Sequence, residues 1–244
     1  MTLAIQVCGY VFGIPLQLLA IGAILRGHYR RYPLVFLYVI ADFLTTVVEI
    51  PSNIAYYAGN PHALDSYVSY YWLDESIMQA FVYAIVLSLI YQATAALPSR
   101  RMLRIVLSGG AILFTGASFL IHHGAHARVG IWMTLWARDL DFCAAVLDLV
   151  LWALLLSSKG RDYRLLMLSG ALGIQFAGDA IGAALRSIGS LAASPTPGTS
   201  NHAFLDAGSA ATVLSYLAYM YILWQAFRAS PTLSPQPAKV PDTR

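Results

Sequence analysis

The chain has 244 residues, of which 58% are hydrophobic and 11% charged, with a formal net charge of +3 and a mean hydropathy of +0.63. A soluble domain carries about 25% charged residues, and a chain of this size cannot hide so large an apolar surplus in one core. The composition therefore excludes a soluble globular protein and indicates an integral membrane protein.

Seven apolar segments follow one another along the chain, each long enough to cross a bilayer, which takes about 20 residues of helix. Their predicted ranges are 3–25, 33–57, 68–97, 102–121, 131–156, 165–188 and 204–227. No basic leader precedes the first segment, so we expect it to be retained rather than removed as a signal peptide. The fold class is therefore predicted to be an all-α integral membrane protein, a seven-transmembrane-helix bundle over residues 1–229 that contacts the lipid bilayer. Residues 230–244 contain four prolines, which favours a disordered Pro-rich cytoplasmic tail.

Basic residues concentrate on one side of the predicted bundle. Twelve of the 15 Lys and Arg residues of the chain lie there, three in each of the first, third and fifth connections between spans and three in the tail. They are Arg26, Arg30, Arg31, Arg100, Arg101, Arg104, Lys159, Arg161, Arg164, Arg228, Lys239 and Arg244. Since short cytoplasmic loops hold the excess of Lys and Arg, the N-terminus is predicted outside and the C-terminus in the cytoplasm. We expect a plasma membrane or a bacterial-type inner membrane. The same asymmetry explains the positive net charge without a nucleic-acid partner.

Nine of the twelve acidic residues fall inside the predicted spans: Asp42, Glu49, Asp74, Glu75, Asp139, Asp141, Asp148, Asp179 and Asp206. A carboxylate at the bilayer centre costs about 3 kcal/mol even on insertion scales. Nine such residues require an internal polar cavity, ion-pair partners or protonation. Most of them lie in the outer half of the bundle, which favours a cavity open to the outside.

The candidate ligand- or ion-binding residues are the acids of that outer half together with the cation at the same depth: Glu49, Asp139, Asp141, Asp179 and Arg138. Asp42 at mid-depth and Asp148 in the inner half are candidates for a proton or ion path inward. The alternative interpretation is structural, in which Arg138 and Asp141 form an ion pair that holds helices together. The acids at the segment ends would then lie at the interface.

The segment 122–126 holds three histidines, and two of them are four residues apart. His122, His123 and His126 are weak candidates for a metal site, because that spacing suits a metal if the stretch is helical. Gly124 disfavours a helix there, so exposed loop histidines are the alternative. These imidazoles are also candidates for a response to pH near neutrality.

Seven helices with an outside N-terminus are the topology of rhodopsins and G-protein-coupled receptors, but the similarity ends there. The lysines, Lys159 and Lys239, lie outside the spans, so none is placed to form a retinal Schiff base. No paired histidines lie at mid-membrane depth to ligate haem. We therefore expect no bound cofactor.

The leading interpretation is a non-enzymatic sensor or receptor-like subunit that binds a small cationic or protonatable ligand in the acidic cavity. It would signal to a separate cytoplasmic or membrane partner. The alternatives are a small proton- or cation-coupled transporter and a metal-dependent membrane enzyme. Gly178 and Gly182 form a small-xxx-small pattern in the sixth segment, which permits close helix packing within the chain or in a homo-oligomer.

Overall fold

The computed structural model describes residues 2–57, 61–96, 100–125, 129–157, 162–191 and 201–228. They form α1 (Thr2–Leu25), α2 (Pro33–Tyr57), α3 (Pro61–Ala93), η1 (a 3-10 turn, Thr94–Ala96), α4 (Arg100–Ala125), α5 (Val129–Ser157), α6 (Tyr163–Leu191) and α7 (Asn201–Arg228). Each α-helix contains a stretch long and apolar enough to cross a membrane. The prediction of a multi-pass, all-helical bundle is therefore confirmed. The predicted tail, 230–244, lies outside the described residues.

Several helices run past the ends of the predicted spans. The largest difference is in α3, which begins at Pro61 rather than at residue 68, whereas its apolar stretch is Ser76–Ala93. Likewise α4 continues to Ala125 rather than ending at residue 121. Hydrophobicity marks the part of a helix that lies in hydrocarbon, but a helix can continue into the interface because its backbone hydrogen bonds are internal.

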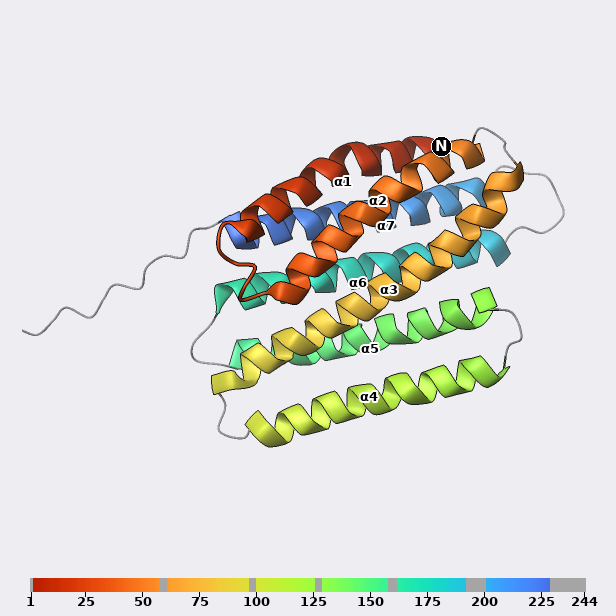
Figure 1. The fold of residues 1–244 in the computed structure, drawn as a ribbon. Coiled ribbons are helices and arrows are strands. Elements are labelled where there is room, and N and C mark those ends of the chain that lie inside the picture. The colour runs from red at the N-terminus through yellow and green to blue at the C-terminus, as the bar shows by residue number, and fades with distance from the viewer. Residues whose placement is uncertain are drawn as a thin grey trace, which may run out of the picture.

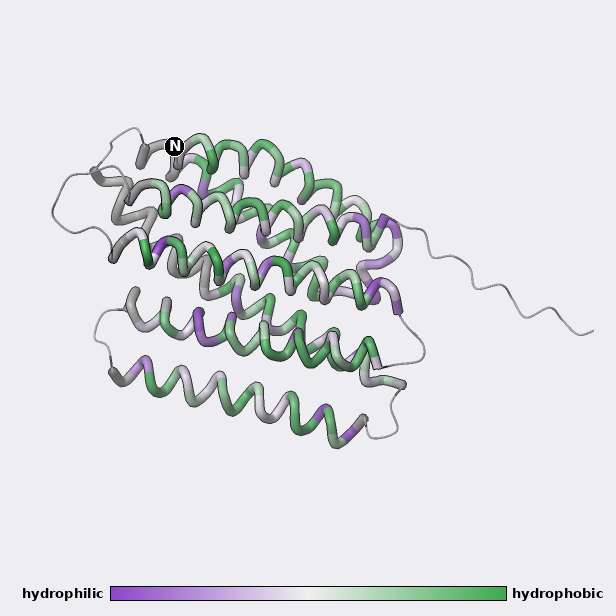
Figure 2. Tube along the Cα trace, turned by 180° about the vertical axis from the view of Figure 1, so that it is seen from behind, coloured by the Kyte–Doolittle hydropathy of each residue, from purple (hydrophilic) through white to green (hydrophobic). Residues whose placement is uncertain are grey.

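The helices pack side by side, from α1 and α2 at one edge of the bundle to α4 at the other (Figure 1). α7 packs between α1 and α6, α3 packs between α2 and α5, and α5 also contacts α6 and α4. α4 packs chiefly against α5, and its apolar stretch is the least buried of the seven. Large apolar side chains cover its outer faces, among them Leu113 and Leu120, and Figure 2 shows hydrophobic residues along most of its length.

The closest helix contact in the bundle lies between α6 and α7. A Cβ atom added at Gly178 would meet the Ser215 side chain, and one added at Gly182 would lie 2.8 Å from the carbonyl oxygen of Gly208. Only glycine allows the two backbones this approach. The small-residue pattern of the sixth segment is therefore used within the chain.

The fold gathers most of the described basic residues at one end of the bundle, which we name the basic end: Arg26, Arg30, Arg31, Arg101, Arg104, Arg164 and Arg228. The C-termini of α1, α3, α5 and α7 and the N-termini of α2, α4 and α6 all lie there (Figure 1). A salt bridge of 3.0 Å between Arg31 and Asp162 joins the α1–α2 turn to the start of α6. Gly27 has φ of +124° within that turn, a conformation that glycine adopts without strain.

Candidate ligand-binding cavity

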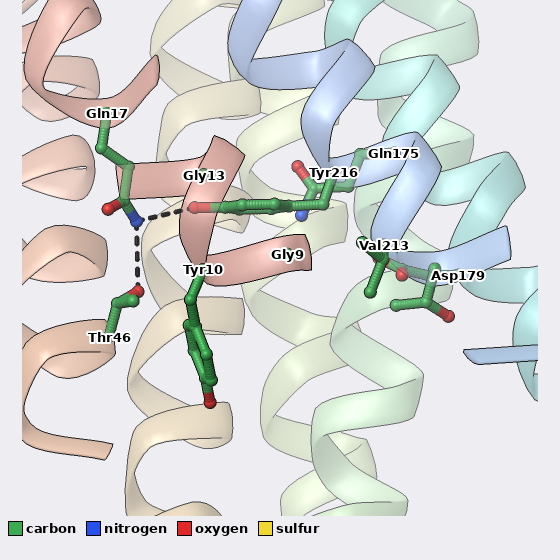
Figure 3. Close-up of a pocket in the computed structure, with 10 residues that line it drawn as sticks. Gly9, Tyr10, Gly13, Gln17, Thr46, Gln175, Asp179, Val213 and Tyr216 are labelled. Atoms are coloured by element: carbon green, nitrogen blue, oxygen red, sulfur yellow. Dashed lines mark hydrogen bonds between the residues drawn. The ribbon is translucent and has the colours of Figure 1, made fainter. Parts of the chain in front are cut away.

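A cavity of about 270 Å³ lies between α1, α2, α6 and α7 (Figure 3). At about 30 Å³ for each water molecule, it has room for roughly nine. Its lining mixes small, aromatic and polar residues: Gly9, Tyr10, Gly13, Gln17, Thr46, Gln175, Asp179, Thr212, Val213 and Tyr216. These positions run from near the middle of the helices toward the end of the bundle opposite the basic end. Asp179 supplies the carboxylate of the lining.

Helical spacing places the contributions of α1, α6 and α7 on one face of each helix. On α1, the residues Gly9, Gly13 and Gln17 are four apart, and the polar pairs on α6 and α7 have the same spacing. Residues four apart lie above one another on a helix surface. Regular i, i+4 spacing therefore turns small or polar side chains of several apolar helices toward one space.

A hydrogen-bond network borders the cavity at Gln17, which is fully buried (Figure 3). The Nε2 atom of Gln17 lies 2.8 Å from Asp42 Oδ2, 3.1 Å from Thr46 Oγ1 and 2.7 Å from the hydroxyl oxygen of Tyr216. The Tyr216 hydroxyl donates to the same Asp42 Oδ2 at 2.6 Å. Asp42 thus joins α1, α2 and α7 at the inner end of the cavity.

The structure divides the sequence-predicted acids into two sets. Asp179 lines the cavity and Asp42 belongs to the network that borders it. Glu49 is two turns beyond Asp42 on α2, half-buried, and lies outside the described lining. The side chains of Asp74 and Glu75 lie outside the described part of the structure.

The acids of α5 have other neighbours. Asp139 Oδ2 accepts a hydrogen bond of 2.6 Å from Ser118 and lies 3.0 Å from Nε2 of His122, both on α4. Asp148 is buried and accepts a 2.7 Å hydrogen bond from Ser169 on α6. Asp141 is half-buried on the same helix. None of the three lines the cavity among the residues described there.

The ion pair between Arg138 and Asp141, which belonged to the structural alternative, does not form in the structure, which describes both residues. The side chain of Arg138 is exposed, whereas that of Asp141 is half-buried. Elsewhere among the described residues, salt bridges join Arg31 to Asp162 and, when the imidazole is protonated, His122 to Asp139. A spacing of three residues permits a contact on a helix surface, but here the two side chains lie in different surroundings.

The adjacent histidines of α4 have different partners. His122 contacts Asp139, while the ring of His123 stacks on Phe119 at 5.4 Å between centroids. His126 lies outside the described residues. In the part of the chain that the structure describes, no group of three His, Cys, Asp or Glu side chains is placed to hold a metal ion.

Sequence reasoning missed most of the cavity because its lining is largely uncharged. Gln17, Thr46, Gln175 and Thr212 carry no charge and lie within largely apolar segments. The i, i+4 spacing of polar residues in α6 and α7, and of small and polar residues in α1, was the available signal. Which of those faces meet is decided by helix packing, which the spacing does not show.

The described lining offers carboxylate, amide, hydroxyl and phenol groups, and it contains no Ser, Cys, His or Lys side chain. These groups suit recognition by charge and hydrogen bonding more than nucleophilic chemistry, which needs a nucleophile beside a base. No family model matches this chain, and no curated protein or solved structure matches it either. The function must therefore be inferred from the cavity.

Proposed function

We propose that this protein is a membrane-embedded, non-enzymatic binding protein, sensor- or receptor-like, for a small cationic or protonatable ligand. One observation carries the proposal: Asp179 lines a cavity of about 270 Å³ that the protein's own side chains do not fill. A carboxylate at membrane depth favours a positively charged or hydrogen-bond-donating occupant, because a neighbouring cation or donor lowers the free energy of a charge in that medium. Asp42, bound to two lining residues, adds a second negative group nearby.

The hydrogen-bond network beside the cavity links a bound ligand to contacts between helices. Tyr216 lines the cavity and donates to Asp42, which also holds Gln17 of α1. An occupant that displaces Tyr216 therefore changes contacts among α1, α2 and α7. The ligand would enter from the side opposite the basic end, taken as the outside. A partner would respond at the basic end, since the connections between the described helices are too short to hold a domain.

A proton- or cation-coupled transporter is the second candidate, and Asp148 is the observation that favours it. Its side chain is buried in the inner half of α5, where it accepts a hydrogen bond from Ser169. Intramembrane carboxylates of this kind serve proton relays in transporters. Transport predicts ligand flux in proteoliposomes that falls in Asp148→Asn while ligand binding in detergent persists, whereas a sensor shows binding without flux.

The first test is thermal unfolding of the purified protein in detergent with a panel of small amines at pH 5–8. A ligand that binds only the folded state adds about 2.7 kcal/mol of stability at 100 times its Kd. We expect an amine to raise the Tm of the wild type and of Asp141→Asn, and to lose this effect in Asp179→Asn. Asp141 is the matched control because it is a half-buried intramembrane acid outside the described lining. An equal response of all three proteins would contradict the proposed cavity.

A further inference from the structure

We propose that one corner of the basic end, formed by the α1–α2 turn and the end of α7, binds the headgroups of anionic phospholipids. We name it the arginine corner and define it by Arg26, Arg30 and Arg228. The inference is independent of the cavity and of its ligand. Three features of the described residues support it: positive charge without a matching acid, a position where the apolar stretches end, and aromatic rings beside the guanidinium groups.

The charge of the arginine corner is not balanced by acids. Asp162 is the acid that the structure describes at this end, and both of its oxygens are engaged. Oδ2 lies 3.0 Å from Nη2 of Arg31, and Oδ1 accepts a hydrogen bond of 3.1 Å from the backbone N–H of Arg164. Arg31 thus matches the charge of Asp162. The three arginines of the corner are exposed, so their charge favours an external anion.

Ring contacts hold the α1–α2 turn against the end of α7. Phe227 packs on His28 with 5.6 Å and on Tyr32 with 5.4 Å between ring centroids. Arg30 lies between these two residues in the turn, and Arg228 follows Phe227 directly. Figure 1 shows the end of α7 beside the turn, and Figure 2 shows hydrophilic residues at this corner. The packing therefore brings arginines from the two ends of the described chain to one place.

The arginine corner lies where the apolar stretches end. The stretch of α1 ends at Leu25, directly before Arg26, and that of α7 ends at Arg228 itself. Leu25 is 53% exposed, so side chains suited to hydrocarbon and to phosphate adjoin here. A phospholipid presents the same order, with acyl chains on one side of its phosphate. This continuity favours a lipid over a soluble anion.

Aromatic rings accompany two of the three guanidinium groups. On α7 the Arg228 guanidinium lies over the Trp224 ring, 5.1 Å from its centroid, and the Trp224 ring lies 5.8 Å from that of Tyr221. In the turn, Nε of Arg30 donates to the hydroxyl oxygen of Tyr29 at 3.0 Å. Trp and Tyr rings prefer the depth of the lipid headgroups. The rings therefore hold both guanidinium groups at the depth of the phosphates.

Arginine is the side chain best suited to this ligand. The N–H groups of a guanidinium match phosphate oxygens in pairs, and Arg30 keeps both Nη atoms for such a contact because Tyr29 engages only Nε. In phosphatidylcholine the choline cancels the phosphate charge, whereas phosphatidylglycerol keeps a net negative charge. Each arginine beside an anionic surface contributes about fivefold in binding, which corresponds to about 1 kcal/mol.

The test measures which lipids the purified full-length protein retains. The protein is reconstituted in vesicles of equimolar phosphatidylglycerol and phosphatidylcholine, extracted in mild detergent and examined by native mass spectrometry. We expect phosphatidylglycerol to be retained at least tenfold over phosphatidylcholine, and inorganic phosphate added at extraction to leave it bound. We also expect phosphatidylglycerol to raise the Tm in detergent more than phosphatidylcholine does, since a ligand of the folded state stabilises it.

Variants assign the retained lipid to the arginine corner. Arg30→Gln and Arg228→Gln should each lower the preference for phosphatidylglycerol about fivefold, and the double variant should abolish it. Arg101→Gln is the matched control, because Arg101 is exposed at the same end on α4, at the opposite edge of the bundle. All of these substitutions are on the surface and should leave the Tm in lipid-free detergent within about 0.5 kcal/mol of unchanged stability.

Three results would overturn the proposal. Equal retention of the two lipids by the wild type would show that the headgroup charge is not recognised, and would leave the basic end to an acidic protein partner. An Arg101→Gln effect as large as that of Arg30→Gln would show a diffuse charge over the whole end rather than a site at this corner. Displacement of phosphatidylglycerol by inorganic phosphate would show that the ligand is a soluble anion.

Discussion

Asp42 and Asp139 are both acids within apolar spans, and each has two partners on its Oδ2 atom. For Asp42 these are Gln17 of α1 and Tyr216 of α7, two residues that line the cavity. For Asp139 they are Ser118 and His122, which lie one turn apart on α4 alone. The two carboxylates make nearly the same kinds of hydrogen bond, but Asp42 borders an unfilled space whereas Asp139 holds the peripheral helix α4 to the bundle. An intramembrane acid therefore indicates a binding site only where space lies beside it.

The packing of α4 supports this distinction, because polar contacts hold this helix to the bundle near both of its ends. At the basic end the Arg104 guanidinium donates to the Tyr91 carbonyl at 2.6 Å and to Thr94 Oγ1 at 2.9 Å. It also lies over the Tyr91 ring, 3.5 Å from the centroid. At the other end Asp139 holds Ser118 and His122. These polar contacts attach a helix that buries little apolar surface against the bundle.

The largest predicted effect comes from the α6–α7 contact, which forms one wall of the cavity. A Cβ at Gly182 would lie 2.8 Å from the backbone oxygen of Gly208, which cannot move aside as a side chain can. We expect Gly182→Ala to lose about 1–3 kcal/mol of unfolding free energy, the usual cost of overpacking. The measurement is thermal or denaturant unfolding in detergent.

Gly116 of α4 provides the matched control, because no atom lies within 4 Å of an added Cβ there. Gly116→Ala should leave stability unchanged or raise it slightly, since alanine is the better helix former. If the two alanine variants lose equal stability, the close packing of α6 on α7 is not what distinguishes the two regions.

The next effect compares the two carboxylates directly. Asp42→Asn removes the charge that receives donors from two helices, and hydrogen bonds to charged groups contribute about 1.5–3 kcal/mol. Asp139→Asn should cost less, about 0.5–1.5 kcal/mol, the contribution of an ordinary hydrogen bond, because its partners Ser118 and His122 lie on the one peripheral helix α4. We also expect Asp42→Asn to abolish or weaken the amine-induced rise in Tm and Asp139→Asn to preserve it. The reverse pattern would place the ligand site at α4 and α5.

Much of the fold follows from the sequence, because lipid dictates it. Apolar runs of sufficient length must form helices in a bilayer, and the seven ranges predicted from composition match the seven helices seen. The close packing at Gly178 and Gly182 also follows from residue size. The exact ends of α3 and α4 do not, because a helix does not have to end where hydrocarbon ends.

The candidate site is less predictable. Asp179 can be selected from sequence as a costly intramembrane charge, and it does line the cavity. Asp139 is costly in the same way, yet it contacts α4. The difference depends on which helix faces meet, a tertiary property. Gln17, which has the most contacts in the network, is uncharged and gave no energetic signal in the sequence.

The smallest predicted effect concerns His28, a buried titratable group at the basic end that belongs to neither region. It is 7% exposed and packs on Phe227, with 5.6 Å between ring centroids. Burial, together with the positive charges of Arg164 and Arg31, lowers the pKa of its imidazole, against a backbone hydrogen bond at Ala23 that raises it. The unfolded chain, with a pKa near 6.5 at this residue, then binds a proton more readily than the folded chain.

The stability that neutral, buried His28 contributes is therefore fully present above pH 6.5. It is lost as the pH falls through the lowered pKa of folded His28. We expect the Tm of the wild type to drop more between pH 7.5 and pH 5 than that of His28→Phe or His28→Gln. His28→Gln keeps a donor for the Ala23 carbonyl and His28→Phe keeps a ring against Phe227. A flattened pH profile in both variants assigns the effect to protonation of His28, whereas a profile as steep as that of the wild type assigns it to other groups.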